Sequence, residues 1–83
     1  MSYAGPEQAM SAEQVRRQFA YNLRLLRERA GISQEGLAKA CDLHRTEVSL
    51  LERCLRSPRL DTMIIIAEGL QLKSLADLVE GIE

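Results

Sequence analysis

The chain has 83 residues, which suits one small domain, and 46% of them are hydrophobic, too many for a disordered chain. No apolar run is long enough to cross a bilayer and no basic-then-apolar secretory signal begins the chain, so we expect a cytoplasmic protein with no membrane partner. The net charge is −1, but residues 16–59 hold ten basic and five acidic side chains whereas residues 60–83 hold one basic and five acidic ones, which suggests one surface suited to an anionic partner.

Residues 1–10 show no periodicity and are predicted to form a flexible N-terminal arm before a single domain at residues 11–83. A helix is expected to begin after Ser11, because a serine cap and Gln14 three residues later can satisfy exposed backbone N–H groups reciprocally. Gly31 is expected to end it, since glycine adopts a left-handed backbone without penalty. Hydrophobic residues between these ends recur at spacings of three and four, which places them on one helical stripe: Val15, Phe19, Leu23, Leu26 and Ala30.

Four shorter helices are predicted to follow. The second begins at a Ser33 cap, and the third spans residues 44–53 after a break at residues 42–43. A proline disfavours a helix in the next loop, and helices are expected again at residues 60–70 and 74–80. The hydrophobic residues expected inside are Leu37, Ala38, Cys41, Leu43, Val48, Leu51, Leu60, Met63, Ile64, Ala67 and Leu70. No segment alternates with a period of two, so we predict an all-α fold, a compact five-helix bundle.

The second and third predicted helices are short and separated by a tight turn. If Val48 and Leu51 are buried, the outer surface of the third helix is left to Arg45, Thr46, Ser49 and Leu50. The second helix then braces the third, which offers this outer surface to a partner. This is the arrangement of a helix-turn-helix, which places its second helix in the major groove of DNA.

Four stretches of the chain resemble one family of regulators. They are GISQEGLA at residues 31–38, LHRT at 43–46, LER at 51–53 and RSPRLDT at 56–62. These stretches are similar, in the same register, to the lambda-repressor/Cro type of helix-turn-helix, the xenobiotic-response-element family. The resemblance covers residues 17–80. The LHRT stretch is similar to the controller proteins of restriction–modification systems. The resemblance implies a lambda-repressor-like DNA-binding domain and a sequence-specific transcriptional regulator, either an activator or a repressor.

Two positions depart from the family pattern. Asp42 replaces the usual glycine at the turn between the helices, and aspartate tolerates left-handed angles better than most residues. Cys54 replaces the usual glycine just after the recognition helix, where cysteine is a poorer fit. We therefore expect the loop after Arg53 to be strained or differently shaped, which leaves the placement of Arg56 open.

The resemblance and the predicted outer surface of the third helix together imply contacts with bases. An arginine can pair with both acceptors of a guanine, and a threonine can offer its hydroxyl or its methyl group. Leu50 is expected either to touch a thymine methyl or to be an ordinary exposed apolar residue. Glu47 is expected either to accept from a cytosine amino group or to form a structural ion pair. The residues assigned to bases are Arg45, Thr46, Glu47, Ser49 and Leu50.

Other residues around the third helix are assigned to the phosphates of double-stranded DNA, contacts that set register and affinity without sequence information. Gln34 matches the family position that touches phosphate and braces the recognition helix. His44 occupies a cap position, so we expect a weak cap or a phosphate contact. The full set is Gln34, His44, Arg53, Arg56 and Arg59. Glu52, a charge within the matching motif, is expected to be the structural partner of a nearby arginine.

One small module makes too few contacts for specific binding at physiological salt, so we expect a homodimer on a pseudo-palindromic operator. Residues 64–66 are three isoleucines that span about 200° of a helix and cannot all face one core. Ile65 stands where the resembling family is usually polar, in the acidic part away from DNA. The predicted dimer contact lies in the last two helices and comprises Ile65, Leu72, Leu75 and Leu78.

Other classes of function find little support in the sequence. Two cysteines and one histidine are too few for a structural zinc site, so we expect free reduced thiols, no metal and no cofactor. We expect no enzyme, because no nucleophile–base pair is evident, and no small-molecule ligand, because no second domain is evident. The alternative is an antitoxin or other protein-interaction module that binds DNA secondarily. A long tail for wrapping a partner would mark it, and only a short stretch follows Glu80.

Overall fold

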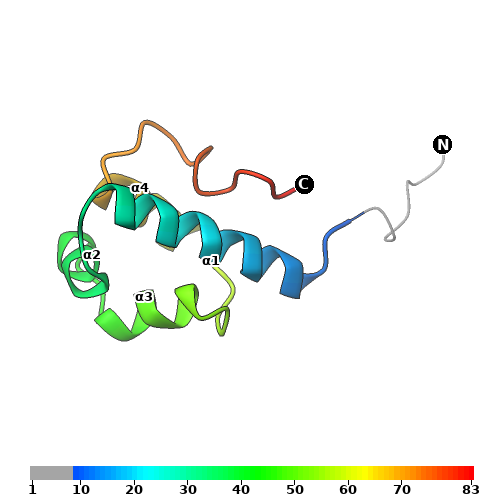
Figure 1. Ribbon diagram of the computed structural model, residues 1–83, viewed down its shortest axis with the longest axis horizontal. Coiled ribbons are helices and arrows are strands. Elements are labelled where there is room, and N and C mark those ends of the chain that lie inside the picture. The colour runs from blue at the N-terminus through cyan, green and yellow to red at the C-terminus, as the bar shows by residue number, and fades with distance from the viewer. Residues whose placement is uncertain (1–8) are drawn as a thin grey trace.

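The computed structural model describes residues 9–83, and Figure 1 shows its helices. They are α1 (Ala12–Arg29), α2 (Gln34–Cys41), α3 (Arg45–Glu52) and α4 (Leu60–Gly69). In Figure 1, α3 lies on one side of the long α1 and the C-terminal segment returns along its other side. No strand occurs within the described residues, so the predicted all-α class is confirmed. The predicted arm at residues 1–10 lies outside the described residues except for its last two.

The first three helices begin at the side-chain caps that the sequence predicts. Ser11 Oγ accepts from Gln14 N at 3.1 Å, and Gln14 Oε1 accepts from Ser11 N at 2.8 Å, which is the reciprocal cap expected for α1. Ser33 Oγ and His44 Nδ1 accept from backbone N–H groups in the first turns of α2 and α3, at 2.9 and 3.1 Å. The starts of these helices are therefore determined by local sequence.

Each of the four helices is followed, one or two positions after its last residue, by a residue with a left-handed backbone. The N–H of that residue and the N–H of the next one donate to carbonyls of the last turn, which is the pairing of a Schellman motif. At α3, Cys54 (φ 63°) donates to Leu51 O at 3.2 Å, and Leu55 donates to Leu50 O at 2.9 Å. Cys54 thus adopts the unfavourable angle, and the loop keeps the hydrogen bonds of the glycine motif. The four left-handed residues are Gly31, Asp42, Cys54 and Gln71.

The prediction of a fifth helix at residues 74–80 is wrong, because this segment forms bends and turns. Asn22 of α1 is buried, and its Nδ2 donates to the carbonyls of Leu78 and Glu80 at 3.0 and 2.8 Å. The backbone hydrogen bonds of this segment are those of isolated turns, from Leu78 N and Val79 N to Leu75 O and from Ile82 N to Val79 O. Gly81 follows with φ 82°. The C-terminal segment is consequently an irregular chain fastened to α1 by one buried amide.

The core takes one face from each helix and one residue from the C-terminal segment. Its buried hydrophobic residues are Phe19, Ala20, Leu23, Leu37, Ala38, Cys41, Val48, Leu51, Ile66, Ala67, Leu70 and Leu78. Leu78 was assigned to the dimer contact, and that assignment is wrong because its side chain is fully buried within one chain. Leu72 and Leu75 are half-buried against the same core. No helix within residues 9–83 is both long and apolar enough to span a membrane.

The interior face of α4 differs from the predicted one. We expected Leu60 and Ile64 inside, but they are 62% and 46% exposed, whereas Ile66 is fully buried. Most positions of α4 are apolar, so the sequence pattern does not single out one face. Packing against α2 determines which face of α4 is buried, because a β-carbon added at Gly69 would overlap the sulfur of Cys41. The absence of a side chain at Gly69 therefore lets α4 approach α2 closely in this one rotation.

Gly69→Ala is expected to lower the free energy of unfolding by about 1–3 kcal/mol, because the added methyl group overpacks the contact with Cys41. Urea unfolding followed by circular dichroism measures this loss. The same change in a Cys41→Ala background should cost much less or even stabilise, since alanine favours a helix over glycine by about 1 kcal/mol. An equal loss in both backgrounds would show that this contact does not orient α4.

Candidate nucleic-acid interface

The pair formed by α2 and α3 has the geometry predicted for a helix-turn-helix. Asp42 ends α2 with φ 54° and ψ 42°, so the chain changes direction at once, and His44 then caps α3. Val48 and Leu51 are 0% and 1% exposed and fix α3 to the core by one side. The opposite side of α3, which begins with the exposed Arg45 and Thr46, is turned away from the core.

The outward side of α3 and the start of α2 line one open hollow. Its lining residues are Arg27, Ser33, Gln34, Glu35, Arg45, Thr46, Ser49, Leu50 and Arg53. The structure therefore brings together four of the five residues assigned to bases and two of those assigned to phosphates, Gln34 and Arg53. Arg45 and Thr46 are exposed, whereas Ser49 and Leu50 are half-buried. The hollow offers arginine, hydroxyl and apolar groups on a single helix face.

The other assigned residues lie on a second flank of α3. His44, Glu47, Arg56 and Arg59 line a separate hollow between the start of α3 and the loop that follows it. The Arg56 guanidinium donates to the Glu47 carboxylate, so of the two alternatives for Glu47 the ion pair is formed. Arg59 pairs with Asp61 at 3.0 Å. Glu47 is thus grouped with the phosphate candidates rather than with the other residues assigned to bases.

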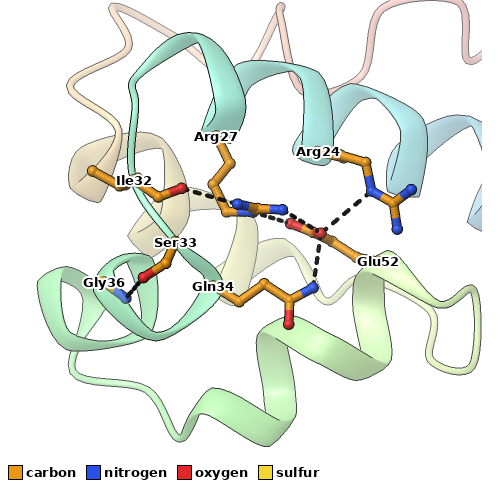
Figure 2. A network of polar contacts seen from close by, with 7 residues as sticks. All are labelled: Arg24, Arg27, Ile32, Ser33, Gln34, Gly36 and Glu52. Atoms are coloured by element: carbon orange, nitrogen blue, oxygen red, sulfur yellow. Dashed lines mark hydrogen bonds and ion pairs between the residues drawn. The ribbon is translucent and has the colours of Figure 1, made fainter.

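A buried carboxylate at the end of α3 connects three parts of the chain (Figure 2). The Glu52 side chain is fully buried, and Arg27 of α1 donates to both its oxygens, at 2.6 and 3.0 Å. Gln34 Nε2 donates to it at 3.0 Å, and the Arg24 guanidinium lies 3.6 Å away. Arg27 also donates to Ile32 O at 2.9 Å. The expectation that Glu52 is the structural partner of an arginine is confirmed.

Sequence reasoning missed which arginines meet Glu52 and what they connect. A signal was present, because Glu52 follows Val48 by one helical turn and so lies beside the buried face of α3. A carboxylate at that position needs a cation, and Arg24 and Arg27 lie three residues apart on α1. The hydrogen bond from Gln34 to Glu52 shows how a residue at the start of α2 braces α3.

The surroundings of Glu52 decide its charge. Burial raises the pKa of its carboxyl group, but the hydrogen bonds from Arg27 and Gln34 and the charges of Arg27 and Arg24 outweigh burial and hold that pKa below its ordinary value. The same pair has the opposite effect on the arginine, because the hydrogen bond to Glu52 raises the pKa of Arg27. Both groups are therefore ionised near neutral pH, and the pair remains intact.

Similarity to known proteins covers the same elements. The family described as Helix-turn-helix, HTH_3, matches residues 23–78. Over 66 residues the chain is 41% identical to control protein C.BamHI of Bacillus amyloliquefaciens, across 76% of this chain and 82% of that protein. Over 48 residues it is 46% identical to a hypothetical transcription factor of Neisseria meningitidis serogroup B, across 58% of this chain and 45% of that protein. The match thus spans less than half of the Neisseria relative.

The fold is also similar to that of a solved structure. The crystal structure of the hypothetical transcription factor NHTF from Neisseria superposes with a TM-score of 0.75 at 33% sequence identity. The superposition covers 94% of this chain and 88% of that one.

Glu52→Gln is expected to lower the free energy of unfolding by about 3–5 kcal/mol at neutral pH, because it leaves the Arg27 guanidinium nearly buried without a counterion. The folded-state pKa of Glu52 is depressed, so its contribution is fully present above the unfolded-state pKa and is lost as the pH falls through the folded-state pKa. Urea unfolding at a series of acidic pH values should therefore show a steeper loss of stability for the wild type than for the variant.

Arg24→Gln provides the matched control. Its side chain is 56% exposed and lies 3.6 Å from Glu52, so solvent screens its charge and its loss should cost less than about 1 kcal/mol. If Glu52→Gln cost no more than Arg24→Gln, the buried pair would not be what fastens α3 to α1.

Proposed function

The chain belongs to the helix-turn-helix family HTH_3, whose pattern it matches over residues 23–78, and on this basis we propose that it is a transcriptional regulator that binds a pseudo-palindromic operator in double-stranded DNA as a homodimer. The observation that supports this best is the outward face of α3, which lines an open hollow together with the start of α2. We infer a binding role rather than catalysis. The role of a restriction–modification controller is supported by the similarity to control protein C.BamHI.

Sequence recognition is proposed for the residues of this face. Arg45 opens α3 and its side chain is 72% exposed, so it can extend to both acceptors of a guanine. Thr46 can donate or accept through its hydroxyl group. Ser49 and Leu50 lie one turn further along, where the hydroxyl and methyl groups suit a base edge and a thymine methyl. These four residues would determine which sequence is bound.

Phosphate contacts are proposed on both flanks of α3. Gln34 and Arg53 lie on one flank, and His44, Arg56 and Arg59 lie on the other. A helix in the major groove has one DNA strand on each side, so side chains on both flanks are within reach of sugar-phosphate backbones. Such contacts would set the depth and register of α3 without distinguishing sequences.

The dimer contact is proposed at the exposed part of α4 and the segment after it. Ile65 is 36% exposed, and Leu72 and Leu75 are half-buried near the chain surface. The exposed Ile64 and Leu60 extend the apolar area on α4. Covering such a patch against a second copy would bury it and present two recognition helices to the two halves of an operator.

Arg45→Ala and Arg53→Ala are expected to weaken DNA binding in different ways. Loss of Arg45 should cost about 1–3 kcal/mol on the preferred duplex and relax preference at one base position. Arg53 makes no ion pair within residues 9–83 and would reach only phosphate. Its loss should weaken all duplexes alike and reduce the salt slope by about one unit. The preferred duplex is the one that the wild type enriches from a randomised library.

Fluorescence anisotropy at several salt concentrations, with the enriched and a scrambled duplex, separates the two effects. If Arg45→Ala lost the same affinity for both duplexes, α3 would not be the element that recognises the base sequence. If the wild type enriched no duplex at all, the proposed function itself would fail.

Ile65→Lys is expected to shift the protein toward monomer, because a charge would be buried in an apolar contact. Sedimentation equilibrium measures the dissociation constant, which should rise at least tenfold for a loss of about 1.4 kcal/mol. Tyr21→Lys makes the same change of charge at an exposed residue of α1 and should leave the dimer unaffected. A dimer that tolerates Ile65→Lys as well as Tyr21→Lys would rule this contact out.

A further inference from the structure

Several arginines assigned to DNA already have carboxylate partners within the chain. Arg45 lies 3.9 Å from Glu35, and Arg59 lies 3.0 Å from Asp61. Arg56 donates a hydrogen bond to Glu47. Acidic side chains thus lie within the surface that would face DNA, where each would repel phosphate. The three pairs differ in geometry, and the difference indicates which of them matters.

The pair formed by Glu47 and Arg56 is the one most protected from solvent. The Glu47 side chain is 21% exposed, against 64% for both Glu35 and Asp61. Water and salt screen an exposed pair and leave it worth little, whereas partial burial preserves the attraction. The pair of Arg45 and Glu35, at 3.9 Å, is also beyond hydrogen-bond distance. Glu47 is therefore the carboxylate that retains its arginine most firmly.

The backbone explains why Arg56 reaches Glu47. Glu47 lies in the first turn of α3, and Arg56 lies in the loop after the same helix. The left-handed Cys54 and the hydrogen bond from Leu55 N to Leu50 O turn the chain back along α3. Arg56 consequently returns to the flank where α3 begins, and its guanidinium meets the carboxylate there.

Binding to DNA of any sequence depends on arginine and lysine side chains that displace counterions from phosphates. An arginine held by a carboxylate must leave that partner before it can neutralise a phosphate. The carboxylate that remains is then an uncompensated negative charge beside the DNA backbone. Both effects weaken binding without reference to base sequence.

We propose that Glu47 is a positioning residue that lowers the affinity of this protein for all DNA sequences, by holding the Arg56 guanidinium so that phosphates must compete for it. This rests on the proposed function, because it assumes that α3 and its flanks face DNA. It gives Glu47 a role other than base contact. The contacts of Arg45 and Thr46 with bases then form a larger part of the total binding.

The test uses Glu47→Gln, which removes the charge and keeps the shape, together with Arg56→Gln and the double variant. Binding to a scrambled duplex and to the duplex enriched by the wild type is titrated by anisotropy between about 50 and 200 mM salt. Glu47→Gln should tighten both by about three- to tenfold and steepen the salt slope by about one unit. In the Arg56→Gln background, Glu47→Gln should gain much less and leave the slope unchanged.

Glu28→Gln is the matched control, because it makes the same change of net charge at an exposed residue of α1. A gain with Glu28→Gln as large as that with Glu47→Gln would overturn the proposal, since net charge alone would then explain it. Weaker binding by Glu47→Gln, with an unchanged thermal unfolding midpoint, would overturn it as well, because Glu47 would then assist binding. These failures differ from failure of the proposed function, in which the wild type enriches no sequence.

Discussion

The position of α3 depends on one buried carboxylate. Removing Glu52 from water costs several kcal/mol, and that cost is offset only if nearly every lone pair meets a donor. Arg27 meets both oxygens, Gln34 meets one of them, and Arg24 adds a charge. These donors come from α1 and from the start of α2, so the last turn of α3 is held where all of them reach it. Apolar packing at Val48 and Leu51 could tolerate small rotations of α3, but this directional set of bonds cannot.

Glu52, Val48 and Leu51 hold α3 from its inner side, so its outer side is turned away from the core. Arg45, Thr46, Ser49 and Leu50 line a hollow that the core does not use. Carboxylates within the chain neutralise part of the positive charge of residues 16–59. Arg27 pairs with the buried Glu52, and Arg56 pairs with Glu47 near the surface. The charge available to an anionic partner is therefore smaller than the count of arginines indicates. Charge counts along a sequence do not distinguish arginines that fasten helices from those that face solvent.

The departures from the family pattern show how much backbone geometry the fold can impose. Asp42 and Cys54 stand where glycine is usual, and both adopt left-handed angles. The Schellman hydrogen bonds at each helix end satisfy carbonyls that would otherwise be unpaired, which offsets the cost of the angle. Asp42 and Cys54 therefore make these turns energetically less favourable than glycine would, but both residues still adopt the left-handed angle. The left-handed Cys54 and the hydrogen bond from Leu55 N to Leu50 O turn the loop that contains Arg56 back along α3.

The sequence by itself determined the features that depend on neighbours along the chain: the caps at Ser11, Ser33 and His44, the end of α1 at Gly31, the all-α class, and the outward residues of α3. Only the tertiary structure decided the rest. The rotation of α4 follows from the contact of Gly69 with Cys41, because a helix that is apolar on most sides carries no periodic signal. The C-terminal segment forms turns rather than a helix, the Asn22 amide of α1 holds it through two of its carbonyls, and Leu78 lies in the core. These contacts join residues that are far apart in the chain, and no local pattern encodes them.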